Sequence, residues 1–128
     1  MSNLFVNKNV NPKENKACDC VVRAIMVATD KKWDDVYTDL CKLGLEMKDM
    51  PNSKPVWKKY LDNNNFTKYS IKVTKGSKRP TVESFTKDHK KGTYILSVAH
   101  HLTVCKDGKY IDSWDCGSKS LYGYWEVE

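Results

Sequence analysis

Residues 17–25 read Ala-Cys-Asp-Cys-Val-Val-Arg-Ala-Ile, and this stretch predicts a buried helix that begins with a thiol. After Cys20, small or apolar residues recur at positions 21, 24, 25 and 28, which is the spacing of one helical face. Such a face packs against a core, with Cys20 at the N-terminus of the helix. Backbone N–H groups at that end favour a negative charge, so they can lower the pKa of the thiol.

Two segments in the last third of the chain carry an imidazole and a carboxylate on predicted neighbouring strands. Residues 99–104 read Ala-His-His-Leu-Thr-Val, and residues 110–115 read Tyr-Ile-Asp-Ser-Trp-Asp. Between them, Asp107-Gly108 is typical of a two-residue hairpin turn. The sequence therefore predicts a hairpin that joins the two segments.

The register of this hairpin determines which side chains meet. With a two-residue turn, His101 and Asp112 project from one face as diagonal neighbours, within reach of a hydrogen bond. His100 and Asp115 then project from the other face, and a one-residue bulge at the turn would exchange the two pairs. A carboxylate beside an imidazole fixes its tautomer and favours its charged form, as the third member of a triad does. We take His101 and Asp112 as the pair.

Three short motifs share one resemblance: Asp-Cys-Val-Val-Arg-Ala at 19–24, His-Leu-Thr-Val at 101–104 and Tyr-Ile-Asp-Ser-Trp at 110–114. Together they resemble the small papain-like cysteine peptidases of bacterial and phage genomes, over nearly the whole chain. The resemblance implies that Cys20 is the nucleophile, His101 the general base and acid, and Asp112 the orienting residue. It also implies a helical lobe against an antiparallel sheet, with the cleft between them.

The residues before the nucleophile depart from papain's own pattern. Papain carries Cys-Gly-[Ser/Ala]-Cys-[Trp/Tyr] at its nucleophile, which residues 17–21 do not match. Papain relatives also place a Gln a few residues before the nucleophile as an oxyanion donor, and residues 11–16 contain none. We take Asn15 as a candidate for this amide, with the backbone N–H of Cys20 beside another donor as the alternative.

The order of the predicted elements favours an α+β fold, with residues 1–128 as a single domain. Helical patterns begin at Cys20, at Trp33 and after Ser53, and a short one follows Thr81; Ser53 and Thr81 are the predicted N-caps of the last two. Apolar alternation and β-branched runs predict strands at 4–6, 69–73, 94–98, 101–105, 110–114 and 122–127. We expect N-terminal helices, the first beginning at the nucleophile, packed on a C-terminal antiparallel sheet.

The composition is that of a globular protein with excess positive charge. The 128 residues are 40% hydrophobic and 30% charged, with a net charge of +6 that favours an acidic partner. No apolar run approaches the ~20 residues that span a bilayer. The N-terminus has no apolar signal segment, so we expect a cytoplasmic protein without a membrane partner. Five cysteines are an odd number, which favours reduced thiols over a disulfide framework.

These features predict a thiol hydrolase, either a peptidase or an isopeptidase. It would cleave an amide bond of a protein or peptide substrate through an acyl-enzyme, with no metal or organic cofactor. The competing hypothesis is a weak or inactive binding module on the same fold, such as a phage protein that contacts a host component through its basic surface.

Two further uses of these residues fit the sequence less well. A zinc site would draw on Cys18, Cys20, His100, His101, Cys105 and Cys116. Their spacing, however, lacks the Cys-x₂₋₄-Cys and His-x₃₋₅-His pairs of structural zinc sites. The basic residues between 72 and 91 lie beside Gly and Pro, as in solvated loops, and no recognition helix or zinc finger accompanies them. We therefore expect no nucleic-acid partner.

Overall fold

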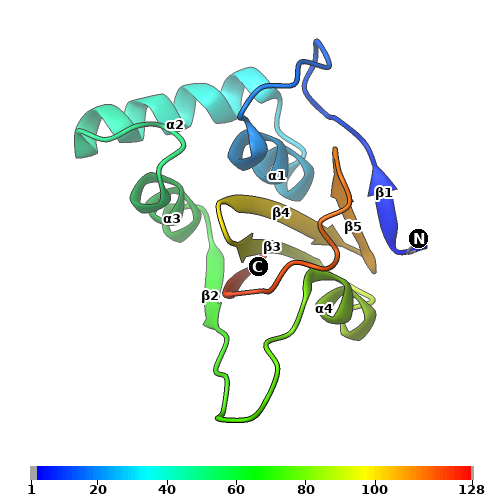
Figure 1. Cartoon of the computed structure of the whole chain (residues 1–128). Helices are drawn as coiled ribbons and strands as arrows, with labels where there is room; N and C mark the ends of the chain where they lie inside the picture. Colours follow the sequence, from blue (N-terminus) through cyan, green and yellow to red (C-terminus); the bar gives the residue numbers. More distant parts are fainter. Residues whose placement is uncertain (1–2, 128) are drawn as a thin grey trace.

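The computed structural model describes residues 3–127, which form four helices and one six-stranded sheet (Figure 1). The helices are α1 (Cys20–Thr29), α2 (Trp33–Met47), α3 (Lys54–Asn63) and α4 (Val82–Asp88). The strands are β1 (Phe5–Asn7), β2 (Phe66–Ser70), β3 (Thr93–Val98), β4 (His101–Lys106), β5 (Lys109–Asp112) and β6 (Gly123–Val127). The predicted α+β class is confirmed.

The sheet is mixed, so the expectation of a purely antiparallel C-terminal sheet is wrong. Its strand order is β1-β5-β4-β3-β6-β2. β1, from the N-terminal end of the described chain, pairs parallel to β5, whereas the other pairs are antiparallel. The aromatic ring of Phe5 stacks on that of Tyr110 at 5.4 Å, and the N–H of Tyr110 donates to the carbonyl of Leu4. These contacts hold the N-terminal segment on the edge of the hairpin.

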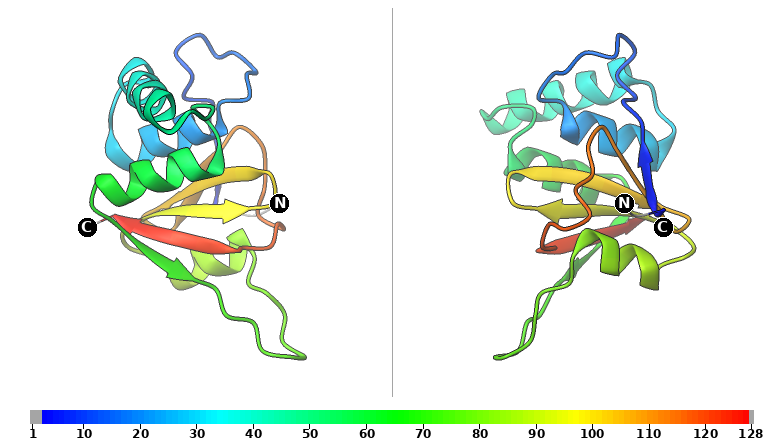
Figure 2. Two further views of the ribbon diagram at one scale, coloured as in Figure 1. Left: turned by 90° about the vertical axis from the view of Figure 1, so that its left-hand side faces the viewer. Right: turned by 45° about the vertical axis from the view of Figure 1, so that its right-hand side comes forward.

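Helices cover both faces of the sheet. Three of them, α1, α2 and α3, lie on one face and build a core with Ile95, Leu102 and Trp125 (Figure 2). The short helix α4 lies on the opposite face and packs with Leu96 and Val98. The central strand β3 is therefore buried on both sides, which explains its nearly continuous apolar sequence.

Helix α1 begins at Cys20, as its sequence predicts, and its predicted stripe at positions 21, 24, 25 and 28 is buried. It ends at Asp30, whose φ of 58° is left-handed and whose N–H donates to the carbonyl of Met26. The helix packs chiefly on β4. This packing brings its first residue close to the beginning of that strand.

Two local predictions need correction. The predicted strand at 69–73 is β2, which runs over Phe66–Ser70 and buries Phe66, while Tyr69 is 41% exposed. Tyr69 lies on an edge strand and stacks on Tyr124 at 5.0 Å, on the face of the sheet opposite to α1, α2 and α3. Ser53 occupies the N-cap position of α3, but its hydroxyl makes no capping hydrogen bond.

The other predicted cap is confirmed, because Thr81 and Ser84 form a reciprocal capping box at α4. The cap sits where the long loop after β2 returns to the sheet. Over residues 3–127, no helix has both the length and the apolar character needed to cross a membrane.

Candidate active site

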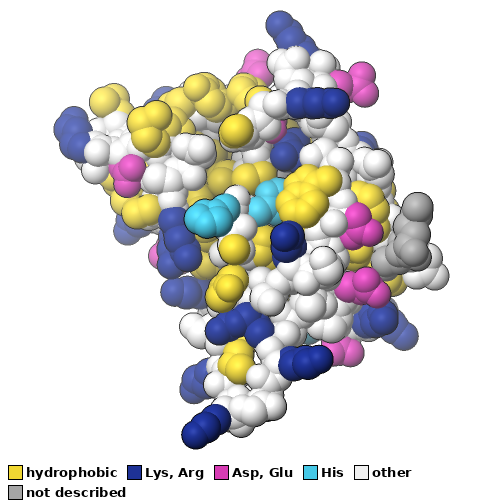
Figure 3. All heavy atoms as spheres, viewed as in Figure 1, with side chains coloured by type: hydrophobic (Ala, Val, Ile, Leu, Met, Phe, Trp, Pro, Cys, Tyr) yellow, Lys and Arg dark blue, Asp and Glu magenta, His cyan; other side chains and the backbone are white. Residues whose placement is uncertain are grey.

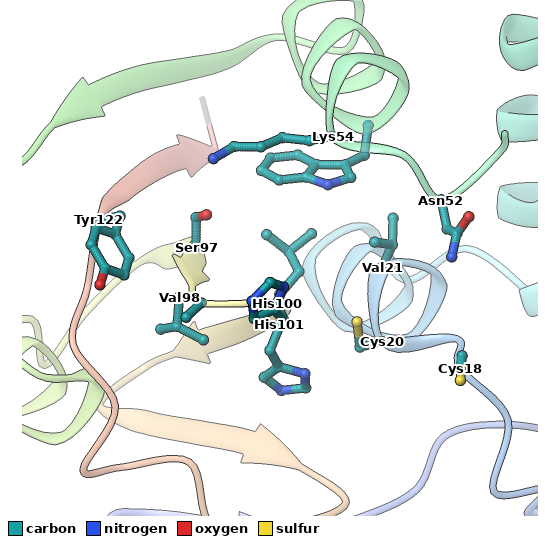
Figure 4. Close-up of a pocket in the computed structure, with 13 residues that line it drawn as sticks. Cys18, Cys20, Val21, Asn52, Lys54, Ser97, Val98, His100, His101 and Tyr122 are labelled. Carbon is teal, nitrogen blue, oxygen red and sulfur yellow. The ribbon is translucent and has the colours of Figure 1, made fainter. Parts of the chain in front are cut away.

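The first residue of α1, the first residue of β4 and the last residue of β5 meet at one end of the sheet. His101 Nε2 lies 2.6 Å from Asp112 Oδ2, so the other ring nitrogen, Nδ1, is left for Cys20. The Cys20 thiol is drawn beside His101 in Figure 4, and His101 and Leu102 are among the neighbours that lower its pKa. The three side chains predicted from the sequence, Cys20, His101 and Asp112, therefore lie together in the structure.

The hairpin has the predicted register. Cys105 pairs with Tyr110 across β4 and β5. Asp107 and Gly108 between the strands have φ values of 50° and 80°, as a two-residue turn of type I′ requires. No bulge shifts the strands, and the diagonal imidazole–carboxylate contact follows from this register.

His100 and Asp115, the alternative pair, lie outside the contact between His101 and Asp112. His100 is an exposed turn residue between β3 and β4, with φ of 55°. Asp115 Oδ1 accepts hydrogen bonds from Tyr110 Oη at 2.6 Å and from the N–H of Gly117 at 2.9 Å. These contacts stabilise the turn after β5, and neither alternative residue contacts the pair of His101 and Asp112 through a hydrogen bond of its own side chain.

The carboxylate of Asp112 is buried and fully hydrogen-bonded. Oδ1 accepts from Arg23 Nη1 at 3.1 Å and from the N–H of Ser113 at 2.7 Å. Oδ2 accepts from His101 and from the Cys116 thiol, the latter at 3.6 Å. Burial alone would raise the pKa of Asp112, but the hydrogen bonds and the charge of His101 outweigh burial and lower it. Asp112 is therefore held as a carboxylate.

A second buried layer stands behind this carboxylate. Arg23, one helical turn after Cys20, donates from Nε to Asp19 Oδ1 at 2.8 Å and from Nη1 to Asp112. Asp19 also accepts from Asn11 Nδ2 at 2.9 Å and from Trp33 Nε1 at 3.0 Å. Through Asp19, the Arg23 guanidinium thus links Asn11 and Trp33 to Asp112.

The thiol and the imidazole shift each other's pKa values in opposite directions. Burial would raise the pKa of Cys20, yet hydrogen bonding to His101 and Leu102 and the charges of His101 and Arg23 lower it. Burial would lower the pKa of His101, yet hydrogen bonds to Asp112, Cys116 and Cys20 raise it to about 11. The arrangement favours a thiolate beside an imidazolium.

An indole ring covers the imidazole. The ring of Trp114 lies 4.9 Å from that of His101, tilted by 50°, and Trp114 is itself 41% exposed. The side chain of His101 is only 9% exposed. Trp114 therefore screens the contact between His101 and Asp112 from water and strengthens its electrostatics.

Cys20 and His101 lie on a groove of about 670 Å³ between the helices and β3. Figure 3 shows this face, with the histidine side chains in cyan at its centre. The groove is open on one side, and Trp57 of α3 and Val98 of β3 are among the residues that line it. A peptide bond lying in it can reach the sulfur and the imidazole together.

Asn15 does not line the groove, so the prediction that it supplies the oxyanion amide is not supported. The residues before α1 form a turn in which Asn11 Oδ1 accepts from the N–H groups of Lys13 and Asn15. This turn leaves Asn15 exposed, and its carbonyl accepts from Asn9 Nδ2. Asn52 lines the groove, and Figure 4 draws it on the same side as Cys18 and Val21.

Sequence reasoning missed Asn52 and Arg23 for different reasons. Asn52 comes from the turn between α2 and α3, and only the tertiary packing of these helices brings it to the groove. Arg23 belongs to the motif at 19–24, and its spacing of four residues from Asp19 on a helix is a visible signal for an ion pair. Arg23 and Asp112 lie far apart in the sequence, so no local pattern predicts the hydrogen bond between them.

The six residues of the hypothetical zinc site are not assembled. Within residues 3–127, the cluster whose ligand atoms come within 4.8 Å of one another contains His101, Asp112 and Cys116. Its closest atoms are joined by hydrogen bonds, with Arg23 on the same carboxylate. A dication there would lie close to the guanidinium charge, which disfavours a metal in this cluster.

Comparison of the chain with known protein families, with curated proteins and with solved structures finds no match. A low-pKa thiolate, a charged imidazole and a fixed carboxylate together can perform nucleophilic attack followed by proton transfer.

Proposed function

We propose that this protein is a papain-like thiol hydrolase, a peptidase or isopeptidase that cleaves an amide bond through an acyl-enzyme. The observation that carries the proposal is the 2.6 Å contact between His101 and the buried Asp112, with Cys20 drawn near the same imidazole. Free buried cysteines are common in protein cores. A buried core cysteine, however, has no need of an imidazole that is oriented by a carboxylate.

Each side chain has a defined part in the reaction. The Cys20 thiolate attacks the carbonyl carbon of the substrate and forms a C–S bond. As the C–N bond breaks, His101 Nδ1–H gives its proton to the leaving amine. His101 then takes a proton from a water molecule, whose oxygen attacks the thioester, releases the acid and restores the thiolate. Asp112 holds the ring through Nε2 in both steps.

The oxyanion that forms in each step needs hydrogen-bond donors near the sulfur. The carbonyl of Asp19 accepts the first helical hydrogen bond of α1, from the N–H of Arg23. The N–H groups of residues 20–22 therefore lack a helical partner. We assign the oxyanion to the N–H of Cys20 and the side-chain amide of Asn52, which lines the same groove.

The proposed chemistry needs a reduced thiol and no cofactor. All five cysteines are free, including Cys20. A reactive thiolate survives best in a reducing compartment, so we place the protein in the cytoplasm. The substrate would be a protein or a peptide that can enter the open groove.

A binding module is the second candidate function, and one feature of the surface favours it. The loop between β2 and α4 extends away from the sheet (Figures 1 and 2) and carries Lys72, Lys75, Lys78 and Arg79. Its basic side chains suit an acidic macromolecule and take no part in the proposed reaction.

A peptide-cleavage screen tests the proposed function. A proteome-derived peptide library is incubated with the wild-type protein and with Cys20→Ala, and new N-termini are identified by mass spectrometry. We expect termini that appear with the wild type and are absent with Cys20→Ala. Equal yields from both proteins would contradict hydrolysis and would favour the binding module.

A further inference from the structure

The groove continues beyond the reacting groups to a polar end. Lys54 at the start of α3, Ser97 on β3 and Tyr122 just before β6 line this end (Figure 4). Tyr122 is fixed against β3, because its N–H donates to the carbonyl of Ser97 at 2.9 Å. Ser97 is 5% exposed, and its side chain lines the groove. Figure 4 draws the Lys54 ammonium and the Ser97 hydroxyl, both hydrogen-bond donors, facing one another, whereas the Tyr122 hydroxyl points away from them.

The charges around this end are positive and unpaired. None of the described residues that line the groove is acidic. Lys54 and Arg79 form no salt bridge with a carboxylate of residues 3–127. The Arg79 guanidinium lies 4.5 Å above the Tyr122 ring, which adds a second cation behind the phenol. On the face shown in Figure 3, Lys and Arg side chains gather to the left of the histidines and below them.

A neighbouring lysine responds to the same positive field. Burial is the largest cause that lowers the pKa of Lys58, and the charges of Lys54 and Lys68 add to it against the opposing charge of Asp62. Mutual repulsion of cations is a cost that a bound anion would relieve. The positive end of the groove thus matches a negatively charged occupant.

We propose that this end of the groove binds an acidic side chain, Asp or Glu, of the peptide substrate. The Lys54 ammonium and the Ser97 hydroxyl donate to its carboxylate, and the Tyr122 ring borders the same end of the groove. Trp57, which also lines the groove, contacts the hydrocarbon part of the substrate. The inference rests on the proposed function, because the same groove places the scissile bond at Cys20.

Matched electrophilic peptides test the acidic subsite. Tetrapeptidyl acyloxymethyl ketones carry Glu, Gln or Lys at one position in turn, and the second-order rate of Cys20 alkylation is measured for each. For the wild type, we expect the best Glu probe to react about tenfold faster than its Gln counterpart, because a charge-assisted hydrogen bond contributes that much. The ratio of the Glu rate to the Gln rate should fall as the salt concentration rises from about 0.05 to about 0.5 M, because dissolved ions screen charges in an open site.

Lys54→Glu is the decisive variant, and Lys59→Glu is its matched control. Both substitutions make the same charge change on α3, but Lys59 is exposed and does not line the groove. With Lys54→Glu, we expect the preference to invert, so that Lys probes react faster than Glu probes. With Lys59→Glu, we expect Glu to remain preferred. An unchanged preference in Lys54→Glu, or equal inversion in both variants, would overturn the proposal.

The outcomes separate the subsite from the proposed function. Equal rates for Glu and Gln probes at Cys20, at every position, would overturn the acidic subsite and leave the thiol enzyme intact. If no probe alkylates Cys20, the proposed function fails, and the subsite is tested by fluorescence anisotropy with a labelled Glu-containing peptide. Binding that is lost in Lys54→Glu and kept in Lys59→Glu would then support the acidic site, and absence of binding would overturn it.

Discussion

Replacement of His101 by alanine is expected to lower the rate of peptide hydrolysis by about 10⁴-fold or more. The variant loses the charge that lowers the pKa of Cys20, and it loses the proton donor for the leaving amine. The fold should persist in this variant, because Asp112 keeps its hydrogen bonds from Arg23, Ser113 and Cys116. The measurement is kcat/KM on a peptide found in the cleavage screen, with circular dichroism to verify the fold.

His100→Asn is the matched control for this variant. His100 is the neighbouring histidine and also lines the groove, but it makes no hydrogen bond with Asp112. Its φ of 55° is left-handed, and asparagine tolerates that conformation better than alanine does. We expect His100→Asn to keep activity within about tenfold of the wild type. Similar losses in both variants would contradict the assignment of His101 as general base.

Replacement of Arg23 by methionine is expected to destabilise the protein by about 3 kcal/mol. The side chains of Arg23, Asp19 and Asp112 are 11%, 6% and 3% exposed, so the variant leaves two buried carboxylates without their common cation. For a chain of this size, such a loss lowers the melting temperature by roughly 10 °C. Thermal and urea unfolding would measure the effect.

Lys87→Met provides the control for Arg23→Met. Lys87 and Glu83 form a pair with the same spacing of four residues, but their side chains are 64% and 38% exposed. We expect this variant to lose about 0.5 kcal/mol or less. Arg23→Met should also slow alkylation of Cys20 near neutral pH, since Arg23 helps to lower the pKa of the thiol. Equal stability of the two variants would show that the buried network contributes little.

The parts of the site that could be predicted depend on local sequence. The helical period after Cys20 and the Asp107-Gly108 turn each act within a few residues, so the start of α1 and the register of the hairpin follow from them. That register is what pairs His101 with Asp112.

The parts that failed depend on contacts between distant segments. Asn15 is close to Cys20 in sequence, whereas a turn built on Asn11 leaves it exposed. Asn52 reaches the groove only because α2 and α3 pack together. The parallel pairing of β1 with β5 likewise joins segments about one hundred residues apart in the sequence, and no local pattern encodes it.

The pH dependence follows from the two shifted pKa values. The thiolate forms as the pH rises through the lowered pKa of Cys20, and the imidazolium persists until the pH approaches about 11. The reactive ion pair therefore exists between these limits, and it is lost at lower pH when the thiolate takes up a proton. An ordinary cysteine reaches its thiolate form only near pH ~8.5.

The most direct test of the central claim is the rate of iodoacetamide alkylation against pH, read separately at Cys20 and Cys18 by mass spectrometry. Cys18 is exposed and lies two residues away, so it serves as the reference thiol in the same molecule. A thiolate–imidazolium pair predicts rapid alkylation of Cys20 at about pH 6, well ahead of Cys18, and loss of that reaction in His101→Ala. Alkylation of Cys20 that rises only towards pH ~8.5, or that is no faster than at Cys18, would contradict the ion pair and the enzyme built on it.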